Sequence, residues 1–416
     1  MLSKWQWTLR QFGKKLWVRA SLFAVLAIAS ALMSPILARL IPADLPASIG
    51  AQAVDSILQI LASSMLAVTT FSLTVMVTHY NTVTSNVTPR ATRLLLEDTT
   101  AQNALGTFIG SFLFSLVGIV TLSTNVYGER GRVVLFAMTI VVIGLIVLTL
   151  LRWIDHLSSL GRIEEPTERV ETATATALAH FGDAPSLGGH PLPDPDNIPA
   201  SAVSVITEKI GYVQHVDIPA LSGIANDTET DIYLTAPAGT FVHSTQPVAQ
   251  ISGSPDDDTL QRVRAAFSIG DIRTFDSDPR FGLSVLAEIA SRALSPGIND
   301  PGTAIDVIGR GVRVLCDWQA RLDKADYSVC YERLWIPPLD PDDLLEHVFL
   351  PIGRDGAGVF EVQIQLQSAL CALAERGGPQ LAAAARRQSA LALARSDEAL
   401  ALQIERERVR AAAPTG

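Results

Sequence analysis

Residues 133–151 read VVLFAMTIVVIGLIVLTLL, a run without a single charged side chain. About twenty predominantly apolar residues are needed for a helix to cross the hydrocarbon core of a bilayer, so this run predicts a membrane-spanning helix. Three further runs of comparable length are apolar, and they cover residues 22–40, 57–78 and 105–122. The sequence therefore predicts an α-helical membrane protein whose residues 1–154 form a transmembrane domain of four helices.

The first of these runs, Leu22 to Leu40, has a competing interpretation. A secretory signal peptide also places an apolar segment after basic residues. This run is too long for that role, and no short apolar region followed by an A-x-A cleavage pattern is present. We interpret it as an uncleaved anchor.

Basic side chains set the expected orientation of the transmembrane domain. The segment before the first span has no acidic residue and carries five basic ones, Lys4, Arg10, Lys14, Lys15 and Arg19. Basic flanks stay in the cytoplasm. Four spans return the chain to the same side, which predicts a bacterial inner-membrane protein with both termini in the cytoplasm. Arg130 and Arg132, in the expected outer loop, run against this rule.

The charge of the chain divides between its two parts. Residues 1–154 hold 11 Lys and Arg against 5 Asp and Glu, whereas residues 155–416 hold 21 against 37. An acidic tail argues against nucleic acid as a partner, because phosphates require a positive face. The cysteines, Cys316, Cys330 and Cys371, have neither a disulfide framework nor metal-type spacing. No metal or cofactor is predicted.

The tail is expected to be a cytoplasmic α+β domain in three parts. Residues 155–200 read as a helix followed by a linker rich in Pro and Gly, and residues 256–416 as a mainly helical domain. Residues 201–255 read as a series of short strands. Within them GTFVHSTQPV (239–248) resembles half of the hammerhead of biotinyl and lipoyl domains, without a lysine at the hairpin tip. A small β-barrel-like subdomain with a structural role is therefore expected.

Threonines recur every four residues along the second span, at Thr70, Thr74, Thr78 and Thr82. On a helix this spacing forms one narrow polar row. Three interpretations compete. The hydroxyls can bond to the carbonyl of the preceding turn, they can bond to a neighbouring helix, or they can line a wet path in which they replace water around an ion. The row alone does not decide between packing and a pore.

Small residues mark the third span. Gly106 and Gly110 form a G-x-x-x-G pair, and Ser111 and Ser115 repeat the interval. Small side chains at this spacing let two membrane helices approach closely. We predict that this face packs against another helix.

The most distinctive stretch of the tail is SRALSPGINDPGTAID, residues 291–306. Asp300 followed by Pro301 is the expected N-cap and first position of a helix, and Ser295 and Pro296 end the helix before it. A tight corner between two helices explains these residues. In the alternative, Asn299, Asp300, Thr303 and the first N–H groups of the new helix form a small polar site.

Residues 71–112 and 266–304 resemble a family of bacterial membrane proteins known as domain of unknown function 2254. RALSP-x-INDP-x-TA, residues 292–304, is the most specific part of the likeness. The family more often has Phe-Ser-Pro-Arg where this chain has Val87-Thr88-Pro89-Arg90. No activity is assigned to it. The resemblance implies an integral inner-membrane protein and gives functional weight to residues 292–303, which include Arg292.

Two functions from different classes fit this sequence. The first is an oligomeric channel or conduit for monovalent cations, lined by the second span, with the tail as its gating and assembly part. The second is a membrane-anchored signalling or scaffold protein whose tail binds a partner or ligand. The bilayer and further copies of the chain are the expected partners. No catalytic motif is present, so catalytic residues are not predicted.

Overall fold

The computed structural model describes residues 3–13, isolated positions between 18 and 29, and residues 53–86, 88–96, 98–123, 129–159 and 164–414. It contains two compact units, and each is considered by itself. The helical unit is Leu9–Glu165, and the mixed unit combines Met1–Thr8 with Pro166–Gly416. The first predicted span, residues 22–40, falls outside the described residues apart from isolated positions.

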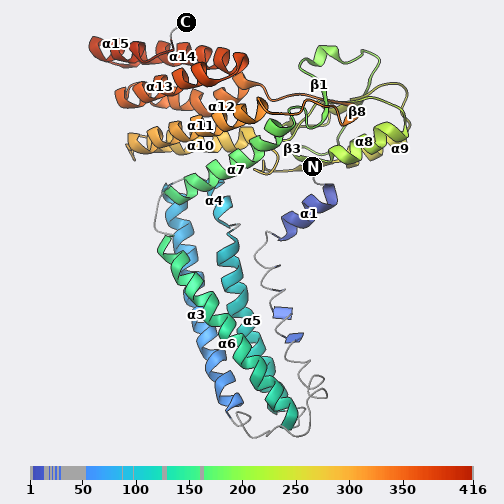
Figure 1. Ribbon diagram of the computed structural model, residues 1–416, viewed down its shortest axis with the longest axis vertical. Helices are drawn as coiled ribbons and strands as arrows, with labels where there is room; N and C mark the ends of the chain where they lie inside the picture. Colours follow the sequence, from blue (N-terminus) through green and yellow to red (C-terminus); the bar gives the residue numbers. More distant parts are fainter. Residues whose placement is uncertain are drawn as a thin grey trace. The chain divides into compact units, whose positions relative to one another are not determined.

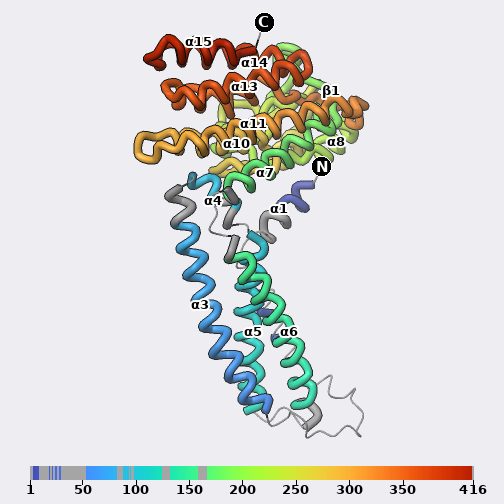
Figure 2. The backbone as a smooth tube through the Cα atoms, turned by 60° about the vertical axis from the view of Figure 1, so that its left-hand side comes forward, coloured from blue at the N-terminus to red at the C-terminus, as the bar shows by residue number. Residues whose placement is uncertain are grey.

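Long helices dominate the helical unit (Figure 2). Its helices are α3 (Val54–Asn86), α4 (Pro89–Leu96), α5 (Thr99–Ser123) and α6 (Glu129–Ser159). Among the described residues, three helices are long and apolar enough to cross a membrane, and these spans are Val54–Asn81, Thr99–Ser123 and Arg132–Leu157. The second, third and fourth runs predicted from the sequence lie within them.

Helix α5 is the central helix of this unit. Half of its apolar window is buried, against 22% for the windows of α3 and α6. The small residues make this possible: a Cβ atom on Gly118 would lie 2.9 Å from Leu58 Cδ1 on α3. Gly106 and Gly110 are buried on the same helix. Close backbone approach therefore allows α5 to pack within the bundle.

Most of the mixed unit is a stack of helices, here called the helical half. It consists of α7 (Glu164–Asp183), α10 (Pro279–Ala293), α11 (Pro301–Leu322), α12 (Pro341–Asp355), α13 (Phe360–Arg376), α14 (Pro379–Ala399) and α15 (Gln403–Ala411). Helices α10, α12 and α14 pack side by side in one layer, and α11, α13 and α15 in a second layer (Figure 1). Asp278, Asp300 and Asp340 cap α10, α11 and α12, each followed by proline at the first position. These local signals fix where the helices begin.

Helix α7 is fastened to this stack by charge and by close packing. Glu171 accepts hydrogen bonds from Arg313 (2.8 and 3.1 Å) and from Arg310 (2.6 Å), both on α11. At Gly282 of α10 a Cβ atom would lie 2.1 Å from Thr174 Oγ1, so only glycine fits there. These contacts hold the segment after α6 on the helical half.

The remaining part of the mixed unit, here called the β half, contains two sheets. The strands are β1 (Gly189–Pro191), β2 (Val203–Ile206), β3 (Gly211–Val216), β4 (Ile232–Leu234), β5 (Phe241–Val242), β6 (Pro247–Ile251), β7 (Phe267–Gly270) and β8 (Tyr331–Ile336), accompanied by helices α8 (Ile218–Asp227) and α9 (Asp257–Ala265) and the short 3₁₀ helix η2 (Pro195–Asn197). One sheet has the order β1-β8-β4-β6-β2, and the other β5-β3-β7. A shared apolar core that includes Val213, Leu221 and Ile251 fills this half.

The prediction of a β-barrel-like subdomain from the sequence is wrong. Closure requires a continuous ladder of paired strands, whereas β1 and β2 are edges of the five-stranded sheet and β3 pairs only within the second sheet. The strands β1, β7 and β8 come from outside residues 201–255. Strand β8 pairs in parallel with both β1 and β4, a long-range pairing that local sequence patterns do not reveal.

The first residues of the chain pack on the β half. Helix α1 (Lys4–Gly13) carries Trp7, whose ring stacks on His215 of β3 with centroids 5.2 Å apart. The Lys4 ammonium donates hydrogen bonds to the carbonyl oxygens of Ala265 (2.5 Å) and Phe267 (3.2 Å), and its backbone N–H to the Asp217 carboxylate. We call this set of contacts the N-terminal clamp.

Candidate functional site

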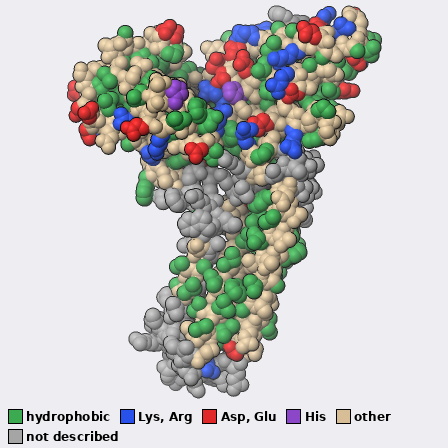
Figure 3. All heavy atoms as spheres, turned by 180° about the vertical axis from the view of Figure 1, so that it is seen from behind, with side chains coloured by type: hydrophobic (Ala, Val, Ile, Leu, Met, Phe, Trp, Pro, Cys, Tyr) green, Lys and Arg blue, Asp and Glu red, His purple; other side chains and the backbone are tan. Residues whose placement is uncertain are grey.

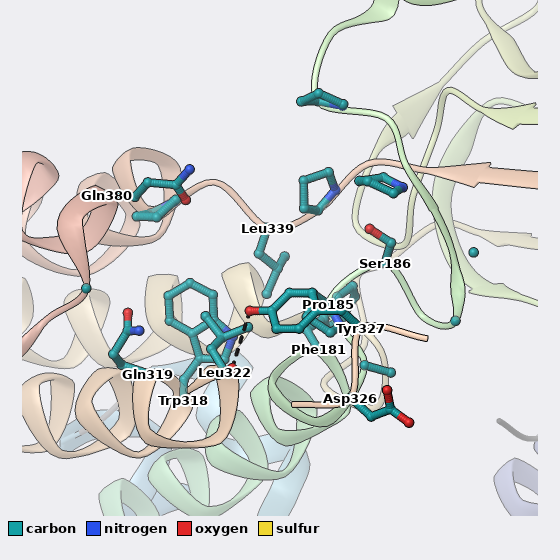
Figure 4. Close-up of a pocket in the computed structure, with 18 of the residues that line it drawn as sticks. Phe181, Pro185, Ser186, Trp318, Gln319, Leu322, Asp326, Tyr327, Leu339 and Gln380 are labelled. Carbon is teal, nitrogen blue, oxygen red and sulfur yellow. Dashed lines mark hydrogen bonds between the residues drawn. The ribbon is translucent and has the colours of Figure 1, made fainter. Parts of the chain in front are cut away.

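A cavity of about 600 Å³ lies between the helical half and the β half of the mixed unit (Figure 4). Its walls come from the loop after α7, the end of α11 with the loop to β8, the loop from β8 to α12, and the turn between α13 and α14. Three of these segments, residues 184–188, 323–330 and 337–340, are connections between the two halves. The cavity therefore touches the segments that join the halves to each other.

Aromatic and aliphatic side chains form the base of the cavity. Trp318 is 3% exposed, and Phe181 and Leu339 are each 8% exposed. The Trp318 indole N–H is buried and has no hydrogen-bond acceptor among the described residues. Tyr327, which is largely exposed, lies across the site and donates its hydroxyl to the Leu322 carbonyl oxygen at 3.3 Å (Figure 4).

Charged groups are few among the described residues that line this cavity. Six prolines line it, and a proline nitrogen in the chain has no N–H to donate: Pro185, Pro191, Pro193, Pro338, Pro341 and Pro379. Asp326 is the one charged residue among the described lining residues. Its carboxylate accepts the Ser328 backbone N–H at 2.9 Å, and this bond holds the pKa of Asp326 below its usual value. The lining is therefore mostly apolar and carries little charge.

The threonine row of the second span lies on an exposed face of α3. Thr70, Thr74 and Thr78 are exposed, and their hydroxyls donate to the carbonyl oxygens of Leu66, Thr70 and Thr74, each at 2.9 Å. The side chain of Thr82 is outside the described residues. Bonding to the preceding turn is therefore present along the row, as one of the three interpretations expected. The row does not lie on the buried face that packs on α5.

The corner at residues 292–303 joins α10 to α11. Asp300 caps α11: its carboxylate accepts the Thr303 backbone N–H at 3.1 Å and the Thr303 hydroxyl at 2.6 Å, and these bonds lower its pKa. Asn299 has a φ of 52°, the left-handed conformation that Asn tolerates better than most residues.

The preceding turn of the corner is also held by local bonds. The Ser295 hydroxyl donates to the Arg292 carbonyl oxygen at 2.6 Å, and Pro296 is exposed. The Asp300 N–H donates to the Ala293 carbonyl oxygen at 2.8 Å. These bonds build the tight corner that its sequence predicts, and a ligand role for it stays a prediction.

A contact between Asp98 and His156, at the end of the apolar helices, was not anticipated. Asp98 caps α5 by accepting the Thr100 N–H at 2.8 Å, and its other oxygen lies 2.8 Å from His156 Nε2 on α6. Both side chains are largely buried, and the His156 ring also contacts Trp153 at 5.6 Å between centroids. Neither residue stands out in the sequence, because each lies among other polar residues near the end of an apolar run.

Surface composition distinguishes the two units (Figure 3). On the face shown, apolar side chains cover much of the described part of the helical unit, whereas charged side chains are spread over the mixed unit. Among the residues that the structure describes, no group of three or more His, Cys, Asp or Glu is arranged to hold a metal ion.

Residues 13–372 match the model of the family described as "Predicted membrane protein (DUF2254)". The chain belongs to this family. Its match includes the apolar helices, the β half and the corner at 292–303, and it ends before helix α14. Most of the segments that line the cavity are therefore family segments, and the residues from Gly378 to Gln380 lie beyond the match.

Two mycobacterial proteins resemble this DUF2254 chain over part of its length. The "Uncharacterized protein Rv1290c" of Mycobacterium tuberculosis and the "Uncharacterized protein Mb1321c" of Mycobacterium bovis are each 29% identical to it over 255 residues, which is 57% of this chain and 47% of the relative. The chain thus spans about half the length of the curated relatives it matches. No solved structure matches it.

Proposed function

We propose that this protein is a membrane-anchored ligand-binding protein whose mixed unit takes a small molecule in the cavity beside Trp318. The observation that carries the proposal is the construction of the cavity from three connections between the helical half and the β half. Largely apolar cavities of this size are where proteins bind small molecules. A molecule held there would contact the connections on which the relative position of the halves depends.

Each half also holds one end of the chain segment that contains the apolar helices. Glu171 and its two arginines hold α7 on the helical half, directly after the last apolar helix. The N-terminal clamp, through Lys4 and Trp7, holds the first residues on the β half. A change in the angle between the halves would therefore move one end relative to the other. This linkage supports a role in which ligand binding changes the membrane helices.

The clamp also bears on topology. Residues 3–8 and residues from 166 onward belong to one unit, which supports an even number of membrane crossings by the chain between them. Three spans are described, and the apolar run at residues 22–40 supplies a fourth. We propose four crossings, with both termini and the mixed unit on the cytoplasmic side of the bacterial inner membrane, where basic flanks are retained.

Ligand-observed NMR of the full-length protein in detergent, against a library of small fragments, tests ligand binding. Ala184→Trp fills the cavity from its wall, and Gln380→Trp, at the exposed rim, fills it from the other side. Ala401→Trp adds the same side chain at an exposed position outside the cavity. Fragments should bind the wild type and Ala401→Trp, and binding should fall in both cavity variants.

Failure of every fragment to bind the wild type contradicts the proposed function. Binding that persists undiminished in both cavity variants contradicts the site. Melting temperatures of the variants separate a filled cavity from a misfolded unit, and the rim variant covers the case in which Ala184→Trp does not fold.

A second function has one observation in its favour. The threonine row is exposed on α3 instead of being buried against α5, which leaves it available to line a conduit between copies of the chain. Back-bonded hydroxyls still present oxygen lone pairs, which monovalent cations accept in place of water. In this reading the protein is a homo-oligomer, and the mixed unit is its gating and assembly part.

Ion flux into liposomes tests this second function. Replacing Thr74 and Thr78 together by valine should reduce flux without reducing the amount of protein in the membrane. Thr69→Val is the matched control, because Thr69 lies on the same helix outside the row and bonds to its own preceding turn at 2.6 Å. Flux that is unchanged by the double replacement, or a protein that carries no flux, contradicts the conduit.

A further inference from the structure

We infer that the cavity takes an uncharged, largely apolar molecule that carries an acceptor oxygen. This inference rests on the proposed function and names the ligand class of the same site. The base of the cavity is made by Phe181, Trp318 and Leu339, and prolines from four segments surround it. Burial of an apolar body against the prolines and the largely exposed Tyr327 ring supplies the affinity, because the gain grows with the apolar area removed from water.

Anions lack a partner in this cavity. Among the described lining residues none is Lys, Arg or His. Arg321, one turn after Trp318, is directed into ion pairs with Asp183 (3.1 Å) and Asp317 (3.2 Å). The proline nitrogens donate nothing. A carboxylate or phosphate in the cavity would lose its water without gaining a counter-charge, which is costly.

Cations are disfavoured for a different reason. The one carboxylate of the lining, Asp326, already accepts the Ser328 N–H. Figure 4 shows this carboxylate on the far side of Tyr327 from Trp318, directed away from the base of the cavity. The aromatic rings at the base are almost fully covered by their neighbours, so little ring face is open to a cation. An organic cation would therefore be desolvated without direct pairing.

Neutral polar side chains also line the cavity, and an uncharged ligand can use them. They belong to Ser186, Gln319, Tyr327, Ser328 and Gln380. A hydroxyl or carbonyl oxygen on the ligand would accept a hydrogen bond from such a donor, which replaces a bond to water that the ligand loses on entering the cavity. The chemistry of the site thus combines an apolar surface with several neutral donors.

Three probes of nearly equal size separate the charge classes: benzyl alcohol, benzylammonium and benzoate. Their dissociation constants for the full-length protein in detergent would be measured by ligand-observed NMR at pH 7. Benzyl alcohol should bind at least ten-fold more tightly than either ion, and Ala184→Trp should abolish its binding whereas Ala401→Trp should not. Asp326→Asn should leave the weak binding of benzylammonium unchanged.

The possible results distinguish this inference from the proposed function. An ion that binds as tightly as benzyl alcohol overturns the ligand class, and so does a loss of benzylammonium affinity in Asp326→Asn. The same conclusion follows if none of the three probes binds while other, charged fragments of the library do. If no fragment of any class binds, the cavity is not a ligand site, and the proposed function fails with it.

Discussion

The N-terminal clamp makes a prediction that can be worked from the structure. Trp7 is 9% exposed and stacks on His215 with an interplanar angle of 6°. Burying a large aromatic side chain contributes about 2–3 kcal/mol, and a stacked pair adds about 0.5–1.5 kcal/mol. The Trp7 indole N–H is buried without an acceptor among the described residues, which subtracts about 1 kcal/mol or more. Trp7→Ala should therefore weaken docking by about 2 kcal/mol.

A change of this size alters the ratio of docked to undocked N-termini by about thirty-fold, since 1.4 kcal/mol corresponds to a factor of ten. Trypsin cleavage after Lys4 reports the undocked state, because the docked Lys4 ammonium is held by the carbonyl oxygens of Ala265 and Phe267. In the full-length protein, brief trypsin treatment followed by mass spectrometry should show cleavage about thirty-fold faster in Trp7→Ala.

Trp5 provides the matched control for this experiment. It belongs to the same helix but is 72% exposed, so Trp5→Ala should leave the cleavage rate close to that of the wild type. Equal acceleration in the two variants would refute the reasoning, because it would mean that the stacking on His215 does not hold the helix. The argument for an even number of membrane crossings would lose its support at the same time.

Three further predictions concern the helical half. Glu171→Ala removes the carboxylate shared by two arginines of α11 and should lower the free energy of unfolding by about 1–3 kcal/mol, measured by thermal melts in detergent. Gly282→Ala should destabilise by about 1–3 kcal/mol, because its Cβ would clash with Thr174. The hydrogen bond to Asp343 raises the pKa of His347 above 6.5. The stabilisation that His347→Gln removes should therefore be full below pH 6.5 and should decline as pH rises through the raised pKa. Thermal melts from pH 5 to 9 that show the same loss of stability at every pH would contradict this.

The pKa of Asp343 sets the lowest pH at which the Asp343–His347 pair contributes to stability. Burial raises the pKa of Asp343, but the bonds from His347 and Arg280 outweigh it and bring the value to about 2. The contribution of the carboxylate is present above its unfolded pKa of about 3.8 and is lost as pH falls toward 2. The His347 effect can therefore be measured between pH 5 and 9 with Asp343 ionised throughout.

Local signals in the sequence predicted the described helices where those signals are strong. The apolar runs at 57–78, 105–122 and 133–151 lie within α3, α5 and α6, and the Asp-Pro pair at 300–301 begins α11. These features depend on length, hydropathy and capping, all of which act within about one helix length of chain. A run of apolar residues has few alternatives in a bilayer, so its structure does not depend on distant parts of the chain.

Other elements were not predicted from the sequence, because their stability comes from partners that are distant in the chain. Strand β8 is surrounded in the chain by helices, and it becomes a strand by pairing with β1 and β4. The barrel prediction failed for the same reason: the strands of residues 201–255 were read as a closed set, whereas strands before and after them complete the sheets.

The candidate site shows most clearly which features depend on local sequence and which depend on the tertiary structure. The sequence by itself determined the family, the apolar helices, the row at Thr70, Thr74 and Thr78 and the corner at Asp300, because each is a short pattern that local chemistry produces. Only the tertiary structure brought Phe181, Trp318 and Leu339 together, from segments separated by more than a hundred residues in one case. No local pattern encodes such a cavity, since its shape is what remains unfilled when separately folded segments pack against one another.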